Sequence, residues 1–250
     1  MTREPAMDQP NQPNQSHRNR LLQLLPRKDL DELVSHLEAV TLEYRQPLSE
    51  ANEPMRSVYF PVTGVISLVN VMADGSAAEV GTIGNEGLAG LPVILGDERG
   101  PMTAYVQVPG MGLRLRAEIL RSALQRSAGM RTVMLHYAHA FFNQVAQSAA
   151  CNHFHDLEQR CCRWLLMTHD RVQSDRFLLT QEFLGMMLGV QRSSVTLAAS
   201  KLKADGVIEY HRGQVTILDR PGLEHRACEC YGVSKREFDR LLGPPTGARA

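Results

Sequence analysis

The polar side chains of residues 191–205 are the ones in this 250-residue sequence whose types and spacing best indicate a chemical role. If the stretch is a helix, its apolar residues share one face, and they are Val195, Ala198, Ala199 and Leu202. The opposite face carries cations and hydroxyls, with no acid before Asp205: Arg192, Ser193, Ser194, Thr196, Ser200, Lys201 and Lys203. Such groups contact phosphate oxygens and base edges, and a helix fits the major groove of DNA.

The flanking segments predict a helix, a tight turn, this second helix and a β-hairpin. The hydroxyl of Thr180 is placed to cap the first helix, and Gly189 ends it with a residue that tolerates a left-handed backbone. After Gly206, two alternating segments flank Arg212 and Gly213, which is typical of a hairpin. A helix-turn-helix with a β-wing is a DNA-reading unit. The agreement of turn, wing and charge favours it over a helical hairpin packed in a core with a solvated polar face.

Residues 179–185, 190–195 and 202–208 resemble the C-terminal domain of the CRP/FNR family of bacterial transcription regulators. Residues 156–160 and 163–166 resemble the helix that opens that domain, and a looser likeness covers about residues 21–242. The resemblance implies base contacts from Arg192, Ser193, Thr196 and Leu197. It implies phosphate contacts from Thr180, Gln181, Ser194, Ser200 and His211.

The residues at the start of the second helix depart from the family pattern. Arg192 keeps the family's arginine, which can bind guanine O6 and N7 bidentately. Ser193 replaces the usual glutamate and Leu197 the usual second arginine, so the preferred DNA site should differ from the best-known family operators.

Composition limits the class of protein. With 43% hydrophobic residues the chain is globular, and a formal net charge of zero excludes a uniformly basic nucleic-acid coat. Five cysteines suit a reducing compartment, and neither a membrane-spanning run nor a signal peptide is evident. We therefore expect a cytoplasmic protein without a membrane partner.

The N-terminal half predicts helical residues 19–42, split by Pro26, followed by short strands over residues 43–116. These strands suggest a small antiparallel barrel or sandwich, and the resemblance implies the β-roll of a cyclic-nucleotide-binding-like sensor domain. Helices are predicted at 117–124, 130–152, 155–171 and within 221–242. Met130, Met134, Tyr137, Phe141, Val145 and Ser148 step along the second of these at close to coiled-coil spacing. The equivalent family helix pairs across a dimer, and the other interpretation is packing on the chain's own sensor core; we expect both, since one face can serve each.

A glycine-rich segment at residues 84–93 is the candidate effector site, because glycines let backbone amides approach a ligand. With the strand that follows, the candidate pocket comprises Gly84, Glu86, Gly87, Gly90, Thr103 and Ala104. Family members that bind cyclic nucleotides use an arginine for the phosphate, and Met102 stands in its place, with Arg99 three residues earlier. A cyclic phosphate without a fixed cation is poorly neutralised. We therefore expect no cyclic AMP and predict no cofactor; a purely structural role in tight turns is the favoured alternative for the glycines.

The cysteines predict no metal site. The first is Cys151, which excludes the N-terminal cluster of the family's iron–sulfur sensors. Residues 225–230 contain His225, Cys228 and Cys230, a fragment of a zinc pattern without an evident fourth ligand. Buried thiols are the favoured interpretation and redox sensing an alternative, and His136, His139, His153 and His155 leave a haem sensor open.

Taken together, the sequence predicts an α+β chain with an antiparallel β-roll, a long dimerisation helix and a C-terminal winged helix-turn-helix. The predicted division is a tail at 1–18, a sensor domain at 19–130, the dimerisation helix at 131–153, the DNA-binding domain at 154–242 and a tail at 243–250. The predicted function is a homodimeric regulator that binds double-stranded DNA, with RNA polymerase as a further partner of an activator and with an unidentified effector. The alternative is a small-molecule sensor whose winged domain contacts proteins. An enzyme is not expected, because no nucleophile–base pair, Walker loop or complete metal set is evident.

Overall fold

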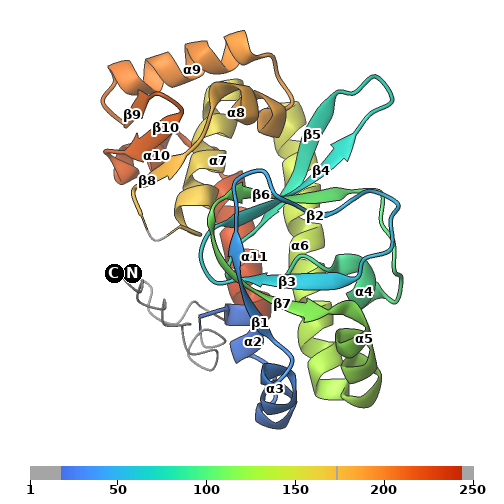
Figure 1. Cartoon of the computed structure of the whole chain (residues 1–250). Helices are drawn as coiled ribbons and strands as arrows, with labels where there is room; N and C mark the ends of the chain where they lie inside the picture. Colours follow the sequence, from blue (N-terminus) through green and yellow to red (C-terminus); the bar gives the residue numbers. More distant parts are fainter. Residues whose placement is uncertain (1–17, 173, 244–250) are drawn as a thin grey trace, which may run out of the picture.

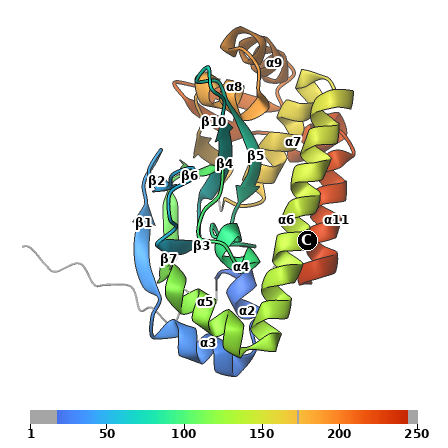
Figure 2. The same ribbon diagram turned by 90° about the vertical axis from the view of Figure 1, so that its right-hand side faces the viewer.

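The long helix α6 (Ala128–Phe154) connects the two halves of the chain (Figures 1 and 2). The computed structural model describes residues 18–172 and 174–243. In Figure 2 the two β-sheets of the N-terminal half lie along one side of α6, and the C-terminal helices α8 and α9 lie near its far end. None of the helices in this described part of the chain is both long enough and apolar enough to cross a membrane. The tails predicted at 1–18 and 243–250 lie outside the described residues, apart from Arg18 and Gly243.

The N-terminal half contains two antiparallel sheets, with strand orders β1-β7-β3 and β2-β6-β4-β5. Its strands are β1 (Glu38–Leu42), β2 (Pro47–Ser49), β3 (Ser57–Pro61), β4 (Val65–Val71), β5 (Ala77–Ile83), β6 (Thr103–Val108) and β7 (Gly110–Arg116). Its helices before α6 are α2 (Arg20–Gln23), α3 (Arg27–Val34), α4 (Leu91–Leu95) and α5 (Ala117–Arg126). Phe60, Ile66 and Leu113 lie in one core with Met134 and Tyr137 of α6, so the long helix covers the core of the predicted sensor domain.

One predicted boundary in this half is wrong. The sequence predicts helix up to residue 42, whereas residues 38–42 form β1, which pairs with β7. Leu42 faces the core, and Val40 and Thr41 are β-branched, which suits a strand. The residues that stabilise β1 lie about seventy positions away in the sequence, at Gly110 to Arg114.

The C-terminal half begins with α7 (Leu157–His169), whose first turn is closed by a capping box between Asp156 and Gln159. After it come β8 (Arg176–Leu178), α8 (Gln181–Leu188), α9 (Arg192–Ala204), β9 (Ile208–His211), β10 (Gln214–Ile217), α10 (Arg220–Arg226) and α11 (Cys230–Leu242). The strands form a small sheet in the order β8-β10-β9. Trp164 and Phe183 lie in a second core, which also takes in Val65 and Val69 of the sensor sheet. The two halves of the chain therefore share buried apolar surface.

The predicted dimerisation seam on α6 is used within the chain. Met130, Met134, Tyr137 and Phe141 are at most 3% exposed and lie in the sensor core. Their spacing along α6 reflects packing on the chain's own sheets, which is one of the two roles expected for this face. This face is therefore not available to a second copy of the helix, and any dimer contact must use another face.

We expect Gly87→Ala to destabilise the fold. A Cβ added at Gly87 would lie 2.3 Å from the ring of Tyr137, and Tyr137 is buried and donates a hydrogen bond to the Leu88 carbonyl. Overpacking of this kind costs about 1–3 kcal/mol. In Gly232→Ala, the matched control, the new Cβ meets only the end of the Arg236 side chain, so this helical substitution should be neutral or stabilise by about 0.5–1 kcal/mol. Urea unfolding measures both changes, and equal effects of the two substitutions would contradict this account.

Candidate nucleic-acid interface and sensor pocket

Helices α8 and α9 meet at the tight turn that the sequence predicted. The side chain of Thr180 accepts a hydrogen bond from the Phe183 amide (3.1 Å), which fixes the start of α8. Gly189 ends α8 with a left-handed backbone, φ 63° and ψ 38°. A Cβ at Gly185 would lie only 3.0 Å from the Val190 carbonyl oxygen, so a glycine there allows the turn to fold closely against α8.

The face of α9 that points away from the core holds all four residues predicted to contact bases. Val195, Ala198, Ala199 and Leu202 are buried, as their spacing predicted. Arg192, Ser193, Thr196 and Leu197 are exposed, and Leu197 exposes 76% of its surface. Arg192 makes no ion pair with any described residue, so its guanidinium is available to a ligand.

The cations at the other end of α9 are neutralised. Lys201 pairs with Glu158, and Lys203 pairs with Glu209. Uncompensated positive charge is therefore concentrated at the N-terminal end of α9, where the helix dipole is also positive.

Two of the predicted DNA contacts are bonded to each other. The Thr196 hydroxyl lies 2.8 Å from the Gln181 side-chain oxygen and 3.0 Å from the Arg192 carbonyl oxygen. This contact joins the predicted base-contacting face of α9 to the start of α8. Among the other predicted phosphate contacts, Thr180 is half-buried as the cap, whereas Ser194, Ser200 and His211 are exposed.

The wing is a hairpin of β9 and β10 joined by a two-residue turn, Arg212 and Gly213. Arg212 and Gly213 both have positive φ (47° and 75°), as a tight turn of this kind requires. The hairpin is held to the domain by pairing of β10 with β8 and places His211 next to the turn.

The glycine-rich segment of the sensor is filled by the protein itself. Glu86 is buried and accepts hydrogen bonds from the Gly84 amide (3.1 Å) and from Arg171 Nε (2.8 Å), which follows α7. A Cβ at Gly84 would meet the Arg171 side chain at 2.5 Å, so this glycine allows close packing. The candidate pocket of the sequence prediction is thus divided, because Gly84, Glu86 and Gly87 are committed to internal contacts.

A small cavity of about 20 Å³ lies beside the remaining part of that pocket. Gly90 and Ala104 line it, together with Met102 and the acidic Glu50 and Glu53. Thr103 is not among the lining residues, and its hydroxyl accepts a hydrogen bond from the Ala51 amide (3.3 Å). No described residue of the lining is a cation, so the cavity offers an anionic phosphate no ion-pair partner.

Two family models match the halves of the chain separately. A cyclic nucleotide-binding domain matches residues 39–127, and a Crp-like helix-turn-helix domain matches residues 159–226. Together they cover more than half of the sequence, in the order sensor then DNA-binding domain. The chain belongs to the CRP/FNR family. This family consists of transcription regulators and not enzymes, as the sequence predicted.

Solved structures of CRP/FNR regulators have the same fold. FixK2 from Bradyrhizobium japonicum superposes with a TM-score of 0.66 at 15% identity, covering 77% of this chain and 98% of its own. The CRP-family regulator TTHB099 from Thermus thermophilus superposes with a TM-score of 0.63 at 18% identity, covering 75% of this chain and 96% of its own. The CRP/FNR-family regulator TTHA1359 from the same organism superposes with a TM-score of 0.59 at 18% identity, covering 76% of this chain and 98% of its own. Among curated protein sequences no significant match to this chain is found.

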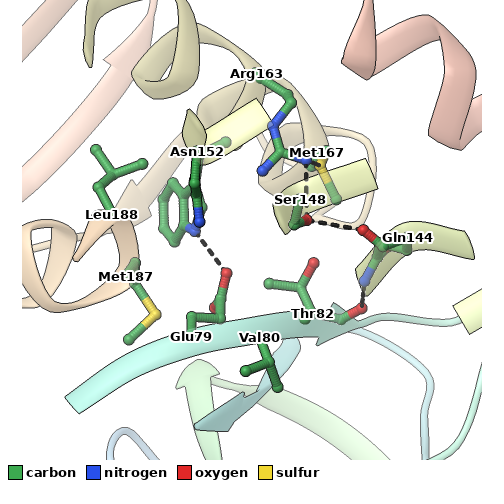
Figure 3. A pocket seen from close by; sticks show the side chains of 12 residues that line it. Glu79, Val80, Thr82, Gln144, Ser148, Asn152, Arg163, Met167, Met187 and Leu188 are labelled. Carbon is green, nitrogen blue, oxygen red and sulfur yellow. Dashed lines mark hydrogen bonds between the residues drawn. The ribbon is translucent and has the colours of Figure 1, made fainter. Parts of the chain in front are cut away.

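In this CRP/FNR chain a polar pocket lies between the sensor and the DNA-binding domain (Figure 3). The Glu79 carboxylate of β5 accepts hydrogen bonds from Trp164 Nε1 of α7 (2.9 Å) and from the Ser67 hydroxyl (2.6 Å). Although part of the residue remains accessible, the carboxylate is enclosed, and desolvation raises the pKa of Glu79 to about 7. The carboxyl group at the contact between the two domains is therefore mostly protonated below about pH 7 and mostly charged above it.

We expect Glu79 to make folding stability fall as the pH rises. Its ordinary pKa is 4.5, so between pH 4.5 and about 7 the folded state holds a proton that the unfolded state has lost. This contribution to the free energy of unfolding is fully present below pH 4.5 and is lost as the pH rises to about 7. The loss is a few kcal/mol at most, since one pKa unit corresponds to about 1.4 kcal/mol. Glu79→Gln should remove this dependence, so the variant should gain stability relative to the wild type from pH 4.5 to pH 8 in urea unfolding. Glu182→Gln, an exposed carboxylate of α8, is the control; a parallel pH profile of Glu79→Gln and wild type would contradict the assignment.

Proposed function

We propose that this CRP/FNR regulator is a homodimer that binds an inverted-repeat operator in double-stranded DNA through α9. The observation that carries the proposal is the unpaired, exposed Arg192 at the positive end of α9, beside Ser193, Thr196 and Leu197. DNA as the target places the proposed action in the cytoplasm, and an activator of this kind would also contact RNA polymerase.

The proposed base contacts combine one strong hydrogen-bonding group with smaller ones. Arg192 donates two hydrogen bonds to guanine O6 and N7, and Ser193 and Thr196 donate or accept single ones. Leu197 supplies an apolar surface suited to a thymine methyl group. Thr180, Gln181, Ser194, Ser200 and His211 bind phosphates and set the position of α9 without reading sequence. The Thr196–Gln181 hydrogen bond keeps one base-contacting and one phosphate-contacting side chain in fixed relative positions.

The proposed dimer contact is an exposed stripe on α6. Its members recur at steps of four and three residues, as in a coiled-coil seam, and they are Leu135, His139, Phe142, Ala146, Ala149 and His153. Leu135 and Phe142 expose 45% and 68% of their surfaces, which is unfavourable for an isolated chain. A two-fold dimer would present two copies of α9, which a two-fold operator requires.

We further propose that DNA binding does not depend on cyclic AMP. The reason is chemical, because the cavity beside Gly90 and Ala104 has the acids Glu50 and Glu53 in its lining and no cation among its described residues. Any effector that uses this cavity would have to be small and uncharged or cationic.

The decisive experiment is selection of random duplex DNA by the purified chain at fixed salt, with and without cyclic AMP. Enrichment of an inverted repeat with half-sites about one helical turn apart, roughly 34 Å, supports the proposal. Affinity should fall steeply with salt, because phosphate contacts release counterions. Absence of enrichment both alone and with cyclic nucleotides and cell extract would favour a protein-binding role for the winged domain.

Arg192→Ala is expected to relax specificity at one base pair in each half-site. Loss of a bidentate contact to guanine costs about 1–3 kcal/mol of discrimination at that position. Selection and competition binding with the variant measure this change directly. Arg240→Ala removes an exposed arginine of α11 that pairs with Glu237, and it should leave affinity and site preference unchanged. An unaltered site preference in Arg192→Ala would refute the placement of Arg192 in the groove.

Phe142→Asp is expected to convert the dimer to a monomer. The substitution places a charge in the middle of the apolar stripe, and desolvating that charge opposes pairing. Size-exclusion chromatography with light scattering gives the molar mass of each variant in solution and so distinguishes monomer from dimer. Met72→Asp, which alters another exposed apolar residue on the β4–β5 hairpin, should remain dimeric. A dimeric Phe142→Asp variant would show that the contact lies elsewhere.

A further inference from the structure

Three cysteines and a histidine converge where α6 ends and α11 begins. Cys151 and His155 lie one helical turn apart at the end of α6, while Cys228 and Cys230 flank the start of α11. The Sγ atoms of the cysteines and a ring nitrogen of His155 all lie within 4.8 Å of one another. The sequence fragment around Cys228 lacked a fourth ligand; the structure replaces His225 with two ligands from a helix more than seventy residues earlier.

We propose that Cys151, His155, Cys228 and Cys230 bind one zinc ion. Zinc prefers four ligands in a tetrahedron, and three thiolates with one imidazole are a common structural set. With Zn–S near 2.3 Å and Zn–N near 2.0–2.1 Å, the ligand–ligand edges of such a tetrahedron measure about 3.8 Å for two sulfurs and about 3.6 Å for sulfur and nitrogen. The observed Cys151–Cys228 Sγ–Sγ distance is 3.5 Å, and Cys230 Sγ lies 3.6 Å from His155 Nδ1. Two edges of the tetrahedron are therefore already formed.

The cluster is separate from both apolar cores. Cys151, Cys228 and Cys230 are at most 4% exposed and form a buried group of their own, without an aliphatic member. Cys161 and Cys162 differ in this respect, because they lie in the second core among leucines and aromatic residues. Ordinary packing accounts for Cys161 and Cys162, but it does not account for a buried group made only of thiols.

The surroundings of the cluster match those of a metal site. His155 directs Nδ1 towards Cys230, and its other ring nitrogen, Nε2, lies 3.2 Å from the Glu229 carboxylate. A carboxylate in this position holds the proton on Nε2 and leaves Nδ1 free to bind a metal. Gln147 Nε2 donates a hydrogen bond to Cys230 Sγ (3.0 Å), which orients a further ligand.

Two arginines of α7 lie near the charge that three thiolates and a divalent ion would carry. Such a site carries one net negative charge, and Arg160 and Arg163 of α7 both interact electrostatically with Cys151. The Nε atoms of both arginines are buried without a hydrogen-bond partner among the described residues, while their other nitrogens donate to Leu188, Ser148 and Met167.

Zinc at this position would connect the proposed dimerisation helix to the DNA-binding domain. Cys151 and His155 belong to the end of α6, and Cys228 and Cys230 to the segment after the wing. Binding would fix the direction in which α6 enters that domain. We therefore expect zinc loss to reduce thermal stability and to weaken operator binding through the position of α9.

The test begins with the full chain, purified in reducing buffer. Elemental analysis should find about one zinc per chain, and competition with a chromogenic chelator gives the affinity. Replacement of zinc by cobalt should produce the visible and thiolate charge-transfer bands of a tetrahedral cobalt thiolate site. Cys151→Ala and Cys228→Ala should each weaken zinc binding by more than about tenfold. Cys161→Ala, which removes an equally buried cysteine outside the cluster, should bind zinc as the wild type does.

Cobalt titration of the wild-type chain keeps the proposal testable if the cysteine variants do not fold. Absence of tetrahedral cobalt bands in the folded wild type would overturn it. Zinc binding that is unaffected by Cys151→Ala and Cys228→Ala would also overturn it. A Cys151–Cys228 disulfide that persists in reducing buffer would do the same, since it would leave only His155 and Cys230 as ligands.

Discussion

A buried ion pair between Glu86 and Arg171 holds the sensor against the DNA-binding domain. Each side chain exposes 9% of its surface, so the pair is favourable only if its remaining hydrogen-bonding groups are satisfied. They are, because Arg171 also donates to the Met167 carbonyl (2.7 Å) and to Gln144 of α6 (3.1 Å), while Glu86 accepts from the Gly84 amide. Three segments distant in sequence are thus fixed to one guanidinium. Removing either charge would leave the other buried without a partner.

This pairing changes the role of the glycine-rich segment. A segment that resembles a ligand cradle here binds a side chain of the same chain, so its glycines serve close packing and its glutamate serves domain contact. Glu79 and Trp164 form a second polar contact between the same two domains. A signal that altered the sensor would have to rearrange one of these contacts in order to move α9. Such a change is a shift between two domain arrangements, each with its own set of satisfied hydrogen bonds.

The elements that the sequence predicted well are those defined by local signals. Thr180, Gly189 and the Arg212–Gly213 turn each specify backbone geometry within a few residues, so the helix-turn-helix and wing could be located from them. Strand β1 and the Glu86–Arg171 pair depend on partners about 70 to 85 residues away, and no periodicity encodes them. The cysteine cluster was not predicted for the same reason, because its members come from distant parts of the sequence. His225 is near Cys228 in sequence, whereas the side chains that join Cys228 come from the end of α6.

Helix α6 shows why a regular apolar spacing did not identify the face that we propose for the dimer. One face, with Met134 and Tyr137, packs in the sensor core, and a second contacts α11 through Asn143 and Gln147. The remaining face still carries exposed Leu135 and Phe142. A helix that is apolar on nearly every side is expected to be covered on nearly every side. Two of the three faces of α6 are covered by its own chain, and a second copy of the helix is the cover that we propose for the third.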